Sequence, residues 1–128
     1  MKDNKPDTRP VNLDLLRISQ PITAITSIAH RISGVLLFLS IPIVIWMLER
    51  SLHSPQGYEQ VISLFDSGLV KLMTLLIAWS VAHHLFAGIR FLLIDFDIGV
   101  TLETARKSAL IVNVLGVVGV LIAVVMIL

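Results

Sequence analysis

The sequence has 128 residues, contains no cysteine and is poor in charge. Without cysteine, neither a disulfide framework nor a thiolate metal site can form. Charged residues make up 15% of the chain, aromatic residues make up 6%, and the net charge is +1. The chain therefore offers neither the basic patch nor the aromatic platform with which proteins bind nucleic acid. We expect no nucleic-acid partner.

Apolar residues, in contrast, make up 55% of the sequence, and the mean hydropathy is +0.88. This composition is typical of a membrane protein. Three segments carry no charge: residues 32–48, 72–89 and 108–128, which are 17, 18 and 21 residues long. A helix of 18 residues spans about 27 Å, close to the hydrocarbon core of a bilayer at about 30 Å. We predict an all-α membrane protein with three transmembrane helices in the lipid bilayer.

The positions of the charges divide the chain into six parts. They are an N-terminal segment 1–20, transmembrane helix I at 21–50, an outer loop 51–68, transmembrane helix II at 69–94, a second loop 95–106, and transmembrane helix III at 107–128. In the outer loop Tyr58, Val61, Ile62 and Phe65 recur at helical spacing, which predicts an amphipathic, interfacial helix. Asn113 is a lone polar group in the third helix, and we expect it to make an interhelical hydrogen bond.

Basic residues predict the orientation. Eight of them lie on the side of the membrane where the N-terminus is expected, before the first span or between the second and third spans. Only two, Arg50 and Lys71, lie on the other side. The eight are Lys2, Lys5, Arg9, Arg17, Arg31, Arg90, Arg106 and Lys107. Because short cytoplasmic segments are rich in lysine and arginine, we predict a cytoplasmic N-terminus and a periplasmic C-terminus.

A polar face is predicted near the start of helix I. Ser27, His30, Arg31 and Gly34 follow one another at i, i+3, i+4 and i+7, which places them on one side of a helix. Arg31 could simply reach the lipid headgroups, with His30 as an interfacial anchor. The convergence of a hydroxyl, an imidazole and a guanidinium favours instead an anionic or carbonyl-bearing ligand, because all three groups can donate hydrogen bonds.

Two adjacent histidines, His83 and His84, lie inside the second uncharged segment. Ionisable residues within a membrane are candidate site residues, and imidazole is a standard axial ligand of haem. Either histidine could instead be buried in an interhelical hydrogen bond. The two are about 100° apart on a helix, so they cannot face the same ligand. Gly88, one turn from His84, leaves room for a flat group, and this favours His84.

The axial position opposite that histidine needs another imidazole. His83 cannot supply it from the same helix, and His53 is expected on the other side of the membrane. His30 is one candidate, and a histidine of another chain is the alternative, because three helices enclose only part of a haem.

Three ordered motifs now resemble a known family. "RPVNLDL" at 9–15, "SIAHRIS" at 27–33 and "HLFAGIRFLLID" at 84–95 are similar to the cytochrome b membrane anchor of succinate dehydrogenase, which is respiratory complex II. The resemblance covers nearly the whole chain. Phe91, Ile94 and Asp97 depart from residues that are usual at these positions, which bears on the haem surroundings and not on the family.

The resemblance implies a fold and a cofactor. The three helices would form half of a heterodimeric helical anchor bundle in the bacterial inner (cytoplasmic) membrane. One haem b would be shared with a sister membrane anchor, the other half of that bundle. His84 matches the axial ligand of its iron, the sister anchor supplies the second histidine, and His30 and Arg31 match positions near the haem propionates.

The resemblance also implies a role in electron transport. Ser27 and Arg31 match the ubiquinone site, which the iron–sulfur subunit and the sister anchor complete. Succinate would be oxidised on a separate flavoprotein subunit, so this chain would carry no succinate-oxidising site. Asp95, near the same membrane surface, is our own candidate for a proton relay to quinone.

Two alternatives stay open from the sequence. The chain could belong to a fumarate reductase that uses menaquinol, or it could be a structural anchor without haem, in which His84 only packs.

Overall fold

The computed structural model describes residues 18–127. The motif at 9–15 and most of the expected segment 1–20 lie outside these residues. The described part contains four helices, α1 (Ile22–His53), α2 (Pro55–Leu64), α3 (Gly68–Asp95) and α4 (Leu102–Ile127), and no strand. Of these, α1, α3 and α4 are long and apolar enough to cross a membrane. The predicted class, an all-α membrane protein with three spans, is confirmed.

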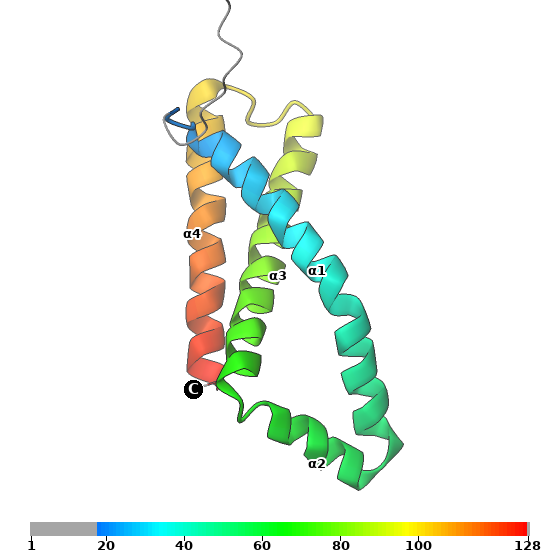
Figure 1. The fold of residues 1–128 in the computed structure, drawn as a ribbon. Coiled ribbons are helices and arrows are strands. Elements are labelled where there is room, and N and C mark those ends of the chain that lie inside the picture. Colours follow the sequence, from blue (N-terminus) through cyan, green and yellow to red (C-terminus); the bar gives the residue numbers. More distant parts are fainter. Residues whose placement is uncertain (1–17, 128) are drawn as a thin grey trace, which may run out of the picture.

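Helix α1 and the pair α3–α4 form two sides of an open triangle. Figure 1 shows α3 and α4 side by side, whereas α1 crosses α3 obliquely and then diverges from it. The short helix α2 closes the third side of the triangle, between the end of α1 and the start of α3. The beginning of α1, the end of α3 and the beginning of α4 lie together at one end, which we call the entry end (Figure 1). Helix α1 therefore contacts both α3 and α4 near the entry end.

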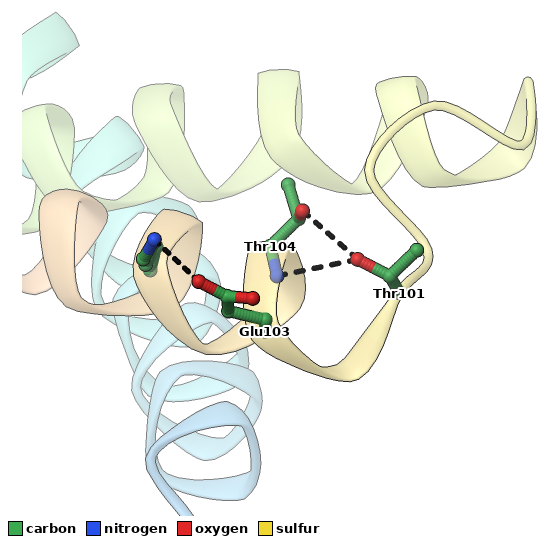
Figure 2. A network of polar contacts seen from close by, with 4 residues as sticks. Thr101, Glu103 and Thr104 are labelled. Carbon is green, nitrogen blue, oxygen red and sulfur yellow. Dashed lines mark hydrogen bonds and ion pairs between the residues drawn. The ribbon is translucent and has the colours of Figure 1, made fainter.

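Helix α4 begins at Leu102, inside the segment 95–106 that we expected to be a loop. Figure 2 shows the reason: the Thr101 hydroxyl lies 2.9 Å from the Thr104 hydroxyl and 3.4 Å from the Thr104 N–H, so it caps the first turn. One turn on, Lys107 and Glu103 form an ion pair of 2.6 Å. The cap and the ion pair stabilise a first turn that contains charged residues. A prediction based on uncharged segments therefore misses this turn.

Helix α2 occupies the middle of the expected outer loop 51–68. The Ser54 hydroxyl accepts a hydrogen bond of 3.0 Å from the Gly57 N–H and caps the helix. Of the predicted apolar face only Val61 is buried, whereas Tyr58 and Ile62 are 56% and 51% exposed. The rest of this face therefore stays available to a membrane interface, where such helices commonly lie.

The interior of the described chain is made of small and polar side chains. Phe38 and Val125, by contrast, are 72% and 83% exposed. The buried side chains are Thr26, Ser33, Ser40, Val61, Ser80, His83, Ala87, Arg90, Ala109 and Val112. This is the reverse of a soluble protein. It is expected in lipid, where small residues let helices approach and large apolar residues face acyl chains.

Gly119 marks a close approach of α4 to α3. A Cβ atom added there would lie 2.5 Å from the Cβ of Ala82. We expect Gly119→Ala to push the helices apart and to destabilise the protein by about 1–3 kcal/mol, the usual effect of overpacking. Thermal unfolding of the purified protein in detergent measures this. Gly68→Ala is the control, because an added Cβ there meets nothing within 4 Å; equal losses in both variants would contradict this contact.

Candidate functional site

The two adjacent histidines of α3 point to different neighbours. His83 is 2% exposed, and its Nε2 lies 3.1 Å from Asn113 Oδ1 on α4. His84 is half-buried, and its imidazole lies against α1. Because adjacent residues of a helix point in different directions, His83 contacts α4 and His84 contacts α1. The interhelical hydrogen bond predicted for Asn113 is confirmed.

The hydrogen bonds of His84 define which of its nitrogens is protonated. Nδ1 lies 3.2 Å from the backbone oxygen of His30 and 3.2 Å from the hydroxyl oxygen of Ser33. The Ser33 hydroxyl itself donates to the His30 oxygen over 2.8 Å. A backbone oxygen can only accept, so Nδ1 of His84 carries the proton, and Nε2 keeps its lone pair.

Histidines and glycines of α1 and α3 pair reciprocally. A Cβ added to Gly34 would lie 2.9 Å from Cε1 of His84, so the imidazole of α3 occupies the space above the glycine of α1. A Cβ added to Gly88 would in turn lie 3.8 Å from Nε2 of His30. The two rings stack at 4.2 Å between centroids, with 17° between their planes. From the sequence we expected space for a flat group beside Gly88, but not that imidazoles lie over both glycines.

The predicted polar face of α1 is divided in the structure. His30 and Gly34 lie at the contact with α3, and Nε2 of His30 is buried without a hydrogen-bond partner in the described part of the chain. Ser27 is half-buried and Arg31 is exposed. The structure thus brings His30 to His84, and it leaves Ser27 and Arg31 on a side of α1 that other subunits can cover.

Asp95 is the last residue of α3 and is exposed at the entry end. It therefore lies at the same end of the bundle as Ser27 and Arg31 (Figure 1).

Several buried polar residues were not foreseen from the sequence. Arg90 is 7% exposed, although we had counted it only as a basic residue near a membrane surface. Its Nε donates to the Ser108 hydroxyl over 2.9 Å, and its Nη2 donates to the Ala105 backbone oxygen over 3.2 Å. Thr26 and Ser33 are fully buried on α1. The two are seven residues apart, a spacing that places them on the same face of a helix. This spacing could have predicted from the sequence that they pack together against another helix.

An apolar cleft of about 670 Å³ opens where α1 and α3 diverge, next to α2. The hydroxyls of Ser40 and Thr74 on its wall donate to backbone oxygens of their own helices, over 2.7 and 2.8 Å. None of Ser27, His30 or His84 lines this cleft. It therefore does not coincide with the site expected from the sequence.

Comparison with known proteins gives a family. A family model described as the succinate dehydrogenase/fumarate reductase transmembrane subunit matches residues 5–123. The chain belongs to this family. It is thus a multi-pass membrane subunit of an oxidoreductase complex, and the family suggested by the three sequence motifs is confirmed.

Individual relatives agree with this assignment. The chain is 38% identical over 116 residues to the succinate dehydrogenase cytochrome b556 subunit of Coxiella burnetii, and the aligned region covers 90% of this chain and 93% of the relative. It is 32% identical over 109 residues to the subunit of the same name from Paracoccus denitrificans, covering 85% and 84% of the two chains. Over 98 residues it is 30% identical to that of Rickettsia prowazekii, covering 77% and 76%.

Proposed function

We propose that this succinate dehydrogenase family member anchors the enzyme in the membrane, shares one b-type haem with a sister membrane anchor, and builds part of the ubiquinone-reduction site. Family membership and three relatives named as cytochrome b556 subunits support this. The relatives also favour succinate dehydrogenase over a fumarate reductase that uses menaquinol.

The observation that carries the haem proposal is the hydrogen bonding of His84. Its Nδ1–H donates to the His30 backbone oxygen and the Ser33 hydroxyl, both at 3.2 Å. Histidines that bind metals are typically held in this way, because donation from one nitrogen fixes the ring and makes the other nitrogen a better ligand. The residues present thus fit one axial ligand of haem iron through Nε2 of His84. When bound, the haem supplies one-electron transfer.

The second axial histidine is assigned to the sister anchor. His83 faces α4, and His53 lies at the far end of α1. The ring of His30 stacks on that of His84 at 4.2 Å, so it is packed against the first ligand and would not supply a second one. A partner chain is therefore the better source. His30, which touches His84, and the adjacent Arg31 are assigned to the surroundings of the propionates.

Ser27 and Arg31 are assigned to ubiquinone. They lie one helical turn apart near the start of α1, half-buried and exposed respectively. Reduction of quinone develops negative charge on its carbonyl oxygens, and a hydroxyl and a guanidinium stabilise that charge when the site is closed from water. Since this chain leaves Arg31 uncovered, the sister anchor and the iron–sulfur subunit would complete the pocket. Asp95 at the same end is proposed as a proton relay.

The proposed setting is the bacterial inner membrane, with the N-terminus cytoplasmic and the C-terminus periplasmic. The entry end then faces the cytoplasm, where the iron–sulfur and flavoprotein subunits dock. Succinate is oxidised on the flavoprotein, and this chain contributes to the transfer of electrons to quinone.

A spectrum of the purified complex tests this function. We expect b-type absorption bands after reduction with dithionite, and faster electron transfer from succinate to ubiquinone than from menaquinol to fumarate. Absence of the bands would leave only the structural anchor, and the opposite order of rates would indicate a fumarate reductase.

A further inference from the structure

A buried polar cluster outside the proposed haem and quinone sites joins all three long helices. Asn113 Oδ1 on α4 lies 3.1 Å from Nε2 of His83 on α3 and 3.2 Å from the Thr26 hydroxyl on α1. His83 is 2% exposed and Thr26 is fully buried. An amide oxygen only accepts hydrogen bonds, so His83 is a donor through Nε2–H.

His83 is also fixed by packing. A Cβ added to Gly116 on α4 would lie 3.3 Å from both Cβ and Cδ2 of His83, so the imidazole lies directly over that glycine. The Trp79 ring lies beside it, at 5.3 Å between centroids. The remaining nitrogen, Nδ1, is buried and has no hydrogen-bond partner among residues 18–127. A histidine held in this way is suited to holding helices together.

The rotation of α3 about its axis is consequently set from two sides. His83 is held over Gly116 of α4, and His84 is held over Gly34 of α1. A rotation of roughly 20° would move a ring atom about 6 Å from the axis by about 2 Å. Such a displacement would break the hydrogen bond of 3.2 Å from His84 Nδ1 to the His30 oxygen. Metal ligands generally need their geometry kept more closely than this.

We propose that His83 is a positioning residue for the haem ligand: by donating to Asn113, it fixes the rotation of α3 and thereby keeps His84 on the His30 oxygen. This inference rests on the proposed function of His84. It assigns His83 no contact with haem.

The experiment compares His83→Leu with His83→Gln in the intact complex, using the midpoint potential and the low-spin electron paramagnetic resonance spectrum of the haem. The leucine variant should keep its haem, with a changed spectrum and a higher potential. Loss of the His84 Nδ1–H hydrogen bond makes the imidazole a weaker donor to iron, which favours the reduced state. The glutamine variant should resemble the unaltered complex, because its amide can donate to Asn113 Oδ1.

Two further variants sharpen the comparison. Asn113→Leu should reproduce the shift of His83→Leu, and the double variant should shift no further, because both remove the same hydrogen bond. His53→Leu is the matched control. That histidine is exposed at the far end of α1, and its loss should leave the potential unchanged.

Several outcomes would overturn the inference. One is an unchanged potential and spectrum in His83→Leu, and another is loss of haem in both His83 variants with haem retained in His84→Leu. If His83→Leu does not assemble, Thr26→Val tests the same inference, since it removes one hydroxyl from the cluster at almost constant volume. An unchanged midpoint potential in Thr26→Val would then contradict the inference. A wild-type complex without b-type bands would refute the proposed function itself, before any variant is compared.

Discussion

Replacement of His84 by leucine is expected to remove the haem from the complex or to loosen it severely. Leucine fills a similar volume and cannot ligate iron, and the adjacent imidazole of His83 cannot take its place, because it donates to Asn113 on α4. The b-type bands in the dithionite-reduced spectrum should fall to a small fraction of their wild-type intensity. Any remaining haem should have a clearly altered midpoint potential, since axial ligands largely set it.

The controls for this prediction come from the same chain. His53→Leu makes the same chemical change at an exposed position at the far end of α1, and its spectrum should be that of the wild type. Copurification of the soluble subunits shows that the variant complex has assembled. An unchanged spectrum and midpoint potential in assembled His84→Leu would show that His84 is not the axial ligand.

The membrane spans could be predicted because lipid imposes a simple requirement. A helix that crosses the bilayer needs about 20 apolar residues, and three uncharged segments meet it. The same rule placed the start of α4 too late, at 107 instead of Leu102. Charged residues of the first turn belong to the helix there because Thr101 caps it and Glu103 pairs with Lys107.

The rotation of each helix could not be predicted from hydrophobicity. In α1 and α3 apolar residues occupy every side, so no apolar stripe indicates which side faces another helix. The buried face of α1 carries Thr26, Ser33 and Ser40, none of which belongs to the polar face that we predicted from Ser27, His30, Arg31 and Gly34. Arg90 was misjudged for a related reason: its partners on α4, Ser108 and the Ala105 oxygen, come from a distant segment.

One pattern in the sequence could have predicted the contact between α1 and α3. "HRISG" at 30–34 and "HLFAG" at 84–88 both place a glycine four residues after a histidine. When two such segments pack in opposite directions, each histidine meets the glycine of the other. The structure has this register, with His84 over Gly34 and His30 near Gly88. Histidine is too large for a close helix contact unless the facing residue is small.

Arg31→Leu and Ser27→Ala are expected to slow the reduction of ubiquinone while the soluble subunits still oxidise succinate. Loss of a charged donor at a developing oxyanion typically costs about 100-fold in rate, and we expect a loss of this order for Arg31→Leu. A neutral hydrogen bond contributes about 1 kcal/mol, so Ser27→Ala should cost about tenfold or less. Parallel assays with ubiquinone and with an artificial acceptor that takes electrons from the soluble subunits measure the two activities.

The ratio of these two activities distinguishes a defect in quinone reduction from a failure of the complex to assemble. Arg106 is exposed near the start of α4, at the same end of the bundle as Arg31, so Arg106→Leu removes the same charge without touching the proposed site. That control should keep both activities. A selective loss of quinone reduction in Arg31→Leu would then come from the position of the guanidinium, because the overall charge of this surface is the same in both variants. Equal loss of both activities in Arg31→Leu would instead mean that Arg31 holds the complex together, and the quinone assignment would fail.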